Sequence, residues 1–284
     1  MNLPAWKPAR ALPPLGWLGL GLLAGCLAPG EAPPARQRAA SQQARAGETA
    51  YLAGHPAAAL PAMREAVRLR LAAGDLPGAV RTLVNLALAE RAAGDAAGAA
   101  ATAARLRELT PAAGQQAAER PRGKDDARLE LTAASAWLEA LLAFDRGETT
   151  LAAGGLAAVS PKLPRGSPWT GRVAALRAEI ALAEGRLADA VALARSALPA
   201  AAAARDVSEE ARAHRLLGAA QMRLGQWKEA QASLLAAVRL EERLGAGERM
   251  ARDLEQLAAV AEKLGDATAA GLYTARARAI LGAR

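Results

Sequence analysis

The sequence predicts an all-α fold built from repeated pairs of antiparallel helices. Alanine accounts for about 80 of the 284 residues, whereas there are two isoleucines and nine valines, and aromatic residues make up 3%. Alanine has the highest intrinsic helix propensity, and strands draw on the β-branched and aromatic residues that are scarce here. Glycines also recur about forty residues apart, which is typical of helical repeat arrays. The length allows one large or two ordinary domains.

The first 25 residues have the features of a secretory signal. Lys7 and Arg10 give a short positive start, and residues 11–23 form an apolar run interrupted by two prolines. This run is too short to cross a bilayer, which takes about 20 apolar residues. We therefore expect residues 1–25 to be removed as a signal peptide.

The signal ends in Leu23-Ala24-Gly25-Cys26, which resembles the lipoprotein box of bacterial lipoproteins. In that family the peptidase cleaves before the cysteine after a diacylglycerol has been attached to its sulfur. The resemblance implies a mature chain that starts at Cys26 and carries two or three acyl chains, such as palmitate. Two or more acyl chains anchor a protein stably in a membrane. Because Cys26 is the only cysteine, no internal disulfide competes for its thiol.

The residues after the cysteine indicate the membrane to which the lipoprotein is sorted and the tether that joins its lipid to the folded part. Inner-membrane lipoproteins of this kind usually carry Asp next to the cysteine, so Leu27 implies an outer-membrane location facing the periplasm. Residues 26–38 are expected to form the lipidated cysteine and a flexible tether, because residues 27–35 (LAPGEAPPA) are rich in proline and small residues. An ordinary signal peptide with a chance cysteine is the alternative interpretation.

Six glycines anchor a repeat of about forty residues. They are Gly54, Gly94, Gly147, Gly185, Gly225 and Gly265, and the interval between the second and the third is longer than the others. Five residues after each glycine lies an alanine: Ala59, Ala99, Ala152, Ala190, Ala230 and Ala270. Glycine or alanine also lies seven residues before each one. Such small side chains at fixed offsets indicate helices that cross nearly backbone to backbone.

This pattern resembles the tetratricopeptide repeat (TPR), which pairs two antiparallel helices with small residues at their crossing. The best copy is LLGAAQMRLGQWKEAQASLLAAV, residues 216–238. Gly218 and Ala230 would meet at the crossing, Gly225 would end the first helix, and Trp227 would pack over the turn. The resemblance covers most of residues 39–282. It implies a right-handed helical-hairpin solenoid of about six pairs, each burying its apolar face against its neighbours.

The array departs from the usual TPR pattern in two respects. Most periods are longer than the usual TPR unit, and only Pro111 clearly matches the proline that closes such a unit. The longer period predicts longer helices, with Gly74, Gly114 and Gly245 at turns between pairs. GDLPGA at 74–79 also fits a turn within a pair, so the register of the first two pairs stays open.

Two segments are expected to interrupt the array. Residues 111–127 are rich in proline, glycine and charge, and are predicted to link an N-terminal block, residues 39–110, to a C-terminal block, residues 128–284. Residues 160–172 are predicted to form a long loop. Trp169 in this loop is either an anchor folded onto the helices or an exposed contact.

The charge pattern argues against nucleic acid as a partner. The formal net charge is +8 and the isoelectric point is about 10.5. However, no run of five or more Lys and Arg occurs, and acidic residues share the same segments, as in Glu-Glu-Arg at 241–243. We interpret most of this charge as solvated helix faces.

No catalytic or metal-binding motif is recognisable. The two histidines, His55 and His214, are expected at the surface, and no HExxH, paired CxxC, GxSxG or GK[ST] pattern occurs. We expect neither an enzyme nor a bound metal or cofactor. A cryptic hydrolase would require two converging titratable groups in a cleft.

The TPR resemblance implies a peptide site on the concave face built by the first helix of each pair. Helical spacing places positions thirteen, ten, six and three before each turn glycine on that face. The candidate contact residues are Arg81, Arg91, Trp137, Phe144, Arg212, Arg215, Met222 and Arg252, with Leu88 and Leu141 beside them. Such a surface suits a peptide with apolar anchors and acidic flanks. The alternatives are a core role for Trp137 and Phe144 and plain solvation of the arginines.

We therefore expect an envelope-anchored lipoprotein that acts as a protein–protein interaction scaffold or adaptor for an envelope assembly. Its partners would be envelope proteins or peptides, and the membrane through its N-terminal lipid. Such TPR lipoproteins support pilus assembly, outer-membrane protein insertion or control of wall hydrolases, and the residues do not choose among these. The alternative is a periplasmic small-ligand or glycan binding module of a transport system, which aromatic residues clustered in one pocket would favour.

Overall fold

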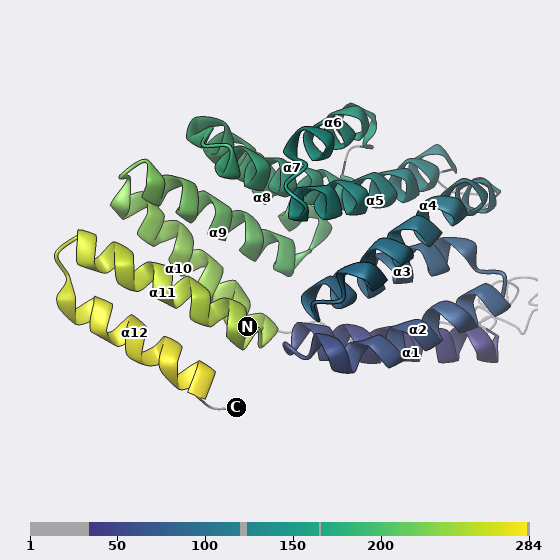
Figure 1. Cartoon of the computed structure of the whole chain (residues 1–284), viewed down its shortest axis with the longest axis horizontal. Helices are drawn as coiled ribbons and strands as arrows, with labels where there is room; N and C mark the ends of the chain where they lie inside the picture. Colours follow the sequence, from purple (N-terminus) through teal and green to yellow (C-terminus); the bar gives the residue numbers. More distant parts are fainter. Residues whose placement is uncertain (1–33, 120–123, 165, 283–284) are drawn as a thin grey trace, which may run out of the picture. The chain divides into compact units, whose positions relative to one another are not determined.

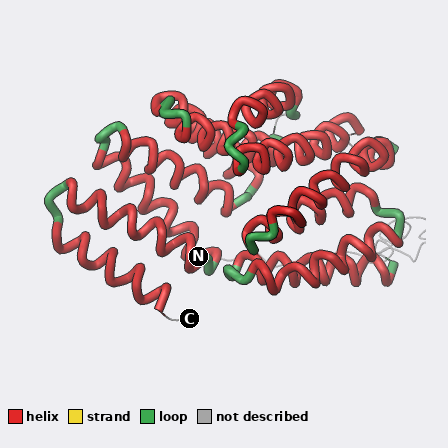
Figure 2. Tube along the Cα trace, viewed as in Figure 1, coloured by secondary structure: helices red, strands yellow, loops and turns green. Residues whose placement is uncertain are grey.

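The computed structural model describes residues 34–119, 124–164 and 166–282, and residues 35–284 form one compact unit of the chain. This described part consists of twelve α-helices and one short 3-10 helix, without any strand (Figure 2). The predicted all-α class is therefore confirmed. The predicted signal peptide, Cys26 and the tether up to residue 33 lie outside the described residues.

The helices form six successive antiparallel pairs (Figure 1). The pairs are α1 (Ala35–Leu52) with α2 (Pro56–Ala72), α3 (Leu76–Ala92) with α4 (Ala96–Ala118), α5 (Lys124–Asp145) with α6 (Thr149–Val159), α7 (Pro168–Ala183) with α8 (Leu187–Ala204), α9 (Val207–Arg223) with α10 (Trp227–Leu244), and α11 (Gly247–Lys263) with α12 (Ala267–Gly282). The 3-10 helix, η1 (Ser160–Lys162), follows α6.

The turn inside every pair contains the glycine that the spacing predicted. These six glycines have φ values between +72° and +84°, a left-handed conformation that glycine adopts without a steric penalty. Gly74 and Gly245 lie in turns between pairs, as expected, with φ values of +69° and +65°. The register of the first two pairs is therefore settled, with Gly54 and Gly94 inside pairs.

The small residues lie where paired helices cross. All six alanines that follow the turn glycines are buried, with Ala59, Ala99, Ala152 and Ala230 completely inaccessible to solvent. A β-carbon added to Gly218 would lie 2.7 Å from Cγ of Leu234 and 3.5 Å from the carbonyl oxygen of Ala230. Normal carbon–carbon contacts are about 3.5–4.0 Å, so only glycine fits here without a shift. The predicted crossing of α9 and α10 is confirmed.

The segment expected to break the array after residue 110 is largely helical. Helix α4 continues through Pro111 to Ala118, so Gly114 lies inside a helix, and its predicted role as a turn was wrong. A β-carbon on Gly114 would lie 3.1 Å from Cγ of Arg128, so this glycine permits a close approach of α4 to α5. One hydrophobic cluster of buried residues extends from Ala59 in α2 to Ile180 in α7 across this segment.

The predicted loop at residues 160–172 is shorter than expected. It contains η1, and α7 already begins at Pro168 behind Ser167, whose hydroxyl accepts a hydrogen bond from the backbone N–H of Trp169 at 3.3 Å. Serine at the N-cap followed by proline is a helix-start signal that the proline-rich composition obscured. Trp169 is therefore a residue of the first turn of α7, and it is buried.

The first helices of the six pairs form a layer of their own, here called the first-helix layer. Besides its partner, each first helix contacts the first helix of the next pair, from α1 with α3 to α9 with α11. Helix α8 is the one described helix that is long and apolar enough to span a membrane, and it packs against α7 and α9 in the array. The first-helix layer positions the site described below.

Candidate functional site

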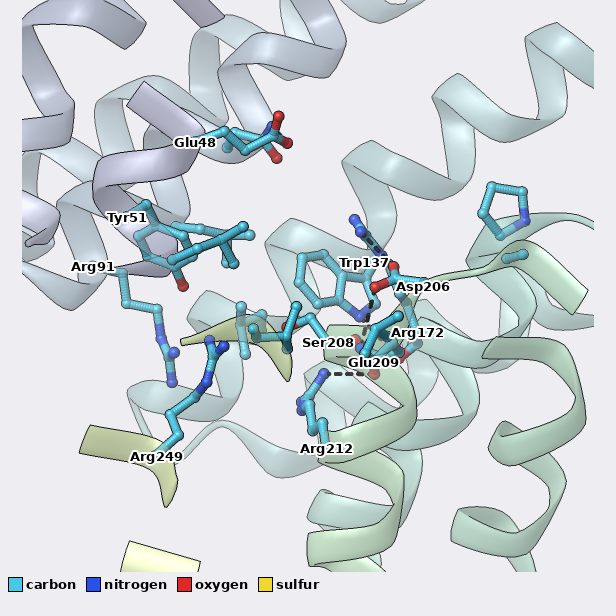
Figure 3. Close-up of a pocket in the computed structure, with 18 of the residues that line it drawn as sticks. Glu48, Tyr51, Arg91, Trp137, Arg172, Asp206, Ser208, Glu209, Arg212 and Arg249 are labelled. Carbon is cyan, nitrogen blue, oxygen red and sulfur yellow. Dashed lines mark hydrogen bonds and ion pairs between the residues drawn. The ribbon is translucent and has the colours of Figure 1, made fainter. Parts of the chain in front are cut away.

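The first-helix layer surrounds a cavity of about 550 Å³, here called the central cavity (Figure 3). Its lining comes from α1, α3, α5, α7, α9 and α11, with contributions from α2 and from the ends of α8 and α10. The apolar part of the lining is Leu52, Met63, Leu88, Trp137, Leu141, Pro168, Ala204, Val207 and Leu244. Charged and polar side chains complete it: Glu48, Tyr51, Asn85, Arg91, Arg172, Glu179, Arg205, Asp206, Ser208, Glu209, Arg212 and Arg249.

The structure brings together some of the candidate contact residues and separates others. Arg91, Trp137 and Arg212 line the central cavity, as do Leu88 and Leu141. Five others do not line this cavity: Arg81, Phe144, Arg215, Met222 and Arg252. The spacing rule therefore placed all eight residues on first helices but did not separate the side chains that reach the cavity from those that lie elsewhere.

Trp137 combines a structural role with a place in the cavity wall. Its side chain is 3% exposed, and its indole N–H donates a hydrogen bond to the carbonyl oxygen of Arg172 at 3.0 Å. Its ring centroid lies 5.8 Å from that of Trp169, with the planes tilted by 57°. The guanidinium of Arg172 lies 5.1 Å from the centroid of the Trp169 ring, within cation–π distance. Both tryptophans thus fasten α5 to α7.

Arg172 is a cavity residue that the sequence analysis missed. It donates two hydrogen bonds to Asp206, with Nη2 at 2.8 Å from Oδ2, and so ties α7 to the α8–α9 turn. Arg172, Arg212 and Arg252 occupy equivalent positions of successive pairs, each thirteen positions before a turn glycine. The same spacing rule would have identified Arg172 if residues 160–172 had not been interpreted as a loop.

The arginines of the central cavity are held by carboxylates. Arg91 binds Asp145 through two hydrogen bonds, one of 2.7 Å between Nη2 and Oδ1, and this pairing raises the pKa of the guanidinium. Burial opposes the charged form of Arg212, but its ion pairs with Glu209 and Glu179 outweigh burial and raise its pKa. These side chains are therefore fixed in orientation before any ligand arrives.

Arg215 belongs to a buried ion-pair network instead of a binding surface. Its Nε lies 2.5 Å from Oδ1 of Asp253, and its Nη2 lies 2.5 Å from Oε1 of Glu241. Asp253 is 0% and Glu241 is 1% exposed, and Arg249 also donates to Glu241 at 3.0 Å. The network joins α9, α10 and α11. The spacing predicted Arg215 on the concave face, but its side chain pairs with acids of α10 and α11.

The other candidate contacts lie elsewhere. Phe144 and Met222 are half-buried and pack against two different hydrophobic clusters, so the core interpretation holds for Phe144 as well as for Trp137. Arg81 and Arg252 are exposed. Arg252 lines a second cavity together with Arg91, which is described below.

The wall of the central cavity also contains an unusual backbone conformation. Arg205, which ends α8, has a φ of +55° and a ψ of +30°, and it is the one non-glycine residue with positive φ in the described chain. Gly245 ends α10 with a φ of +65° and a ψ of +24°, at the equivalent position of the next repeat. The chain therefore places arginine at a position where the next repeat has glycine.

The two histidines lie in different environments. His55 is exposed and precedes α2, as expected, whereas His214 is half-buried and burial lowers its pKa. Within the described residues, no three His, Cys, Asp or Glu side chains are grouped so that they could hold a metal ion.

Comparison with known proteins identifies the fold but no family. No family model and no curated protein matches the sequence. BtubC (BKLC) from P. vanneervenii is similar in structure, with a TM-score of 0.57 and 20% identity over 88% of this chain and 92% of that one. A Rap protein complexed with Competence and Sporulation Factor gives a TM-score of 0.51 and 14% identity over 87% of this chain and 66% of that one. Podosopora anserina TPR-like repeats related to kinesin light chain give a TM-score of 0.47 and 21% identity, covering 72% and 95% of the two chains. The fold is a TPR-like all-α repeat array.

Proposed function

We propose that the protein is an interaction scaffold that holds a segment of a partner protein in the central cavity. The observation that carries this proposal is the cavity lining, to which six different first helices contribute. A continuous lining with apolar residues and pre-oriented arginines suits an extended or helical segment with several anchors. The Rap protein with a similar fold was solved in complex with Competence and Sporulation Factor, which supports a protein-binding role for this fold.

A photo-crosslinker in the wall would test this role directly. Tyr51, which is half-buried and lines the cavity, would be replaced by p-benzoylphenylalanine, and crosslinked products would be identified in envelope extracts of the producing bacterium by mass spectrometry. Leu272 is the control position, because its side chain is 67% exposed on α12. We expect a defined partner from position 51 that position 272 does not give.

A steric variant completes the experiment. Ser208→Trp should fill part of the cavity and abolish the crosslink, because Ser208 lines the cavity and its side chain is small. Ser196→Trp is the matched control on the exposed face of α8. Equal crosslinking in both tryptophan variants would contradict a partner in the cavity.

We further propose that the scaffold is anchored by lipid on Cys26 in the bacterial envelope, with the outer membrane as its location. The support is the Leu23-Ala24-Gly25-Cys26 sequence and the absence of any other cysteine from the sequence. Cys26→Ser should move the protein from the membrane to the soluble envelope fraction and remove labelling by an alkyne fatty acid. Retention of the serine variant in the membrane fraction would rule out lipid as the anchor. The proposal that the scaffold serves an envelope assembly rests on this location.

The alternative role in small-ligand or glycan binding gains no support from the aromatic residues. Glycan sites present exposed aromatic faces, whereas Trp137 and Trp169 are 3% and 9% exposed and pack against each other. The aromatic residues that line the central cavity are Trp137 and Tyr51, and Trp169 lies behind Trp137 outside the lining. The crosslinking experiment separates the two roles, because a glycan or small ligand would leave position 51 without a protein product.

A further inference from the structure

A second cavity of about 580 Å³, here called the end cavity, adjoins the central one. Four residues line both cavities: Tyr51, Leu52, Arg91 and Arg249. The rest of its lining comes mainly from the first pair and the last pair of the array, and consists of Gly54, Pro56, Ala92, Ala246, Glu248, Arg252 and Leu281. A segment that occupies the central cavity can therefore continue between α1 and α11 without crossing a wall.

The end cavity is rich in cations. Arg91 comes from α3, and Arg249 and Arg252 come from α11, whereas Glu248 is the single acidic residue of its lining. Figure 3 shows the side chains of Arg91 and Arg249 extending toward each other from opposite sides. The carboxylates that hold them, Asp145 and Glu241, belong to neither cavity lining. These acids orient the guanidinium groups without lining either cavity themselves.

Unused hydrogen-bond donors remain on these arginines. Arg91 uses Nε and Nη2 for Asp145, which leaves Nη1. Arg249 uses Nε for Glu241, and its Nη2 is buried without a partner. Arg252 is exposed and has no hydrogen bond or ion pair with any other described residue, although Arg172 and Arg212 at the equivalent positions both pair with acids. The donors of Arg91 and Arg252 are therefore available to an acceptor in the end cavity, whereas Nη2 of Arg249 is inaccessible to solvent.

We infer that the end cavity binds a carboxylate of the partner segment, adjacent to the apolar residues that occupy the central cavity. This inference rests on the proposed binding function and names the chemistry that the partner must carry. Carboxylate oxygens accept several N–H donors at once, and charge-assisted hydrogen bonds to arginine are roughly twice as strong as neutral ones. A carboxylate here would accept hydrogen bonds from arginines of α3 and α11 together, so binding would tie the first half of the array to the last pair.

The carboxylate has two sources, an acidic side chain or the C-terminus of the partner, and one selection separates them. The purified protein would be incubated with a synthetic library of random dodecapeptides, half with free and half with amidated C-termini, and retained peptides would be sequenced by mass spectrometry. We expect retained peptides to combine a run of apolar residues with an adjacent carboxylate. Enrichment of internal Asp or Glu in both halves indicates a side chain, whereas enrichment confined to the free-acid half indicates the C-terminus.

Arg252→Gln tests the site on the peptides that the wild-type protein selects. Because Arg252 is exposed and pairs with no described residue, this change should leave folding intact and weaken binding about tenfold or more. Arg195→Gln on the exposed face of α8 removes the same charge away from both cavities and should change the affinity by less than about twofold.

The outcomes separate this inference from the proposed function. Selected peptides without a carboxylate preference, or equal affinities for wild type and Arg252→Gln, would overturn the carboxylate site and leave peptide binding standing. Equal weakening by Arg252→Gln and Arg195→Gln would also overturn it, because the effect would then be that of net charge. If the wild type retains no peptide beyond what Ser208→Trp retains, peptide binding in the cavity is refuted and the carboxylate site with it.

Discussion

The crossing of α9 and α10 predicts that replacing glycine by alanine has different effects on stability at Gly218 in α9 and at Gly154 in α6. Replacing glycine by alanine inside a helix is expected to stabilise it by about 1 kcal/mol when the methyl group meets nothing. A β-carbon at Gly154 in α6 has no neighbour within 4 Å, so Gly154→Ala should gain about that amount. At Gly218 the same methyl group would lie 2.7 Å from Cγ and 2.9 Å from Cδ2 of Leu234, which is completely buried. Overpacking of this kind costs about 1–3 kcal/mol.

The two variants should therefore differ in free energy of unfolding by about 1–3 kcal/mol, with Gly154→Ala the more stable. Thermal unfolding followed by circular dichroism measures the difference, and a gap of about 2–12 °C in melting temperature corresponds to it for a chain of this size. Helix propensity cancels in the difference between the two variants, because both replace glycine by alanine inside a helix. Equal melting temperatures would show that α9 and α10 do not cross at Gly218.

Four further predictions follow from individual contacts. Arg215→Gln should lower the free energy of unfolding, measured by urea denaturation, by about 3 kcal/mol. The reason is that the buried carboxylates of Asp253 and Glu241 lose a cationic partner. A loss below about 1 kcal/mol would show that these ion pairs are solvated like surface pairs. Burial raises the pKa of Asp253 above its ordinary value of 3.8, so the folded chain binds this proton more tightly than the unfolded chain does. The wild type should therefore gain stability relative to Asp253→Asn as the pH falls from neutral toward 3.8, and the opposite trend would show that the ion pair with Arg215 outweighs burial. Ala230→Leu should cost about 1–3 kcal/mol, because Ala230 is 0% exposed at the crossing, and an unchanged melting temperature would contradict this packing. Arg205→Gly should raise the stability by about 1 kcal/mol, since only glycine adopts this backbone conformation freely, while weakening capture of the partner at position 51.

The repeat architecture was predictable because its determinants are local. A turn that needs positive φ selects glycine, and a crossing without room for a side chain selects alanine or glycine, whatever the rest of the chain does. Gly225 with Ala230 and Gly265 with Ala270 therefore mark their pairs from sequence alone. The role of Gly114 was not predictable in this way, because glycine also permits close helix packing, and here the packing partner is Arg128 of the next helix.

The candidate site was only partly predictable, because its key contacts join residues far apart in sequence. The spacing rule placed Arg91, Arg212 and Arg215 on one face of the first helices. It could not show that Arg215 meets Asp253, 38 residues away, or that Arg91 meets Asp145, 54 residues away. The side of a helix follows from periodicity, whereas the partner of a charge depends on how successive pairs stack.

Arg205 occupies a backbone conformation that favours glycine and also lines the central cavity. Helices α8 and α10 are both 18 residues long and end in the same left-handed conformation one repeat apart, yet only α10 ends in glycine. At the end of α10 the left-handed position is occupied by glycine, which adopts this conformation freely, and Gly245 lines neither cavity. At the end of α8 the same position is occupied by Arg205, whose side chain lines the central cavity. Arginine in place of glycine at this position therefore adds a side chain to the cavity wall at the cost of backbone strain, and such departures from local consistency concentrate at functional sites.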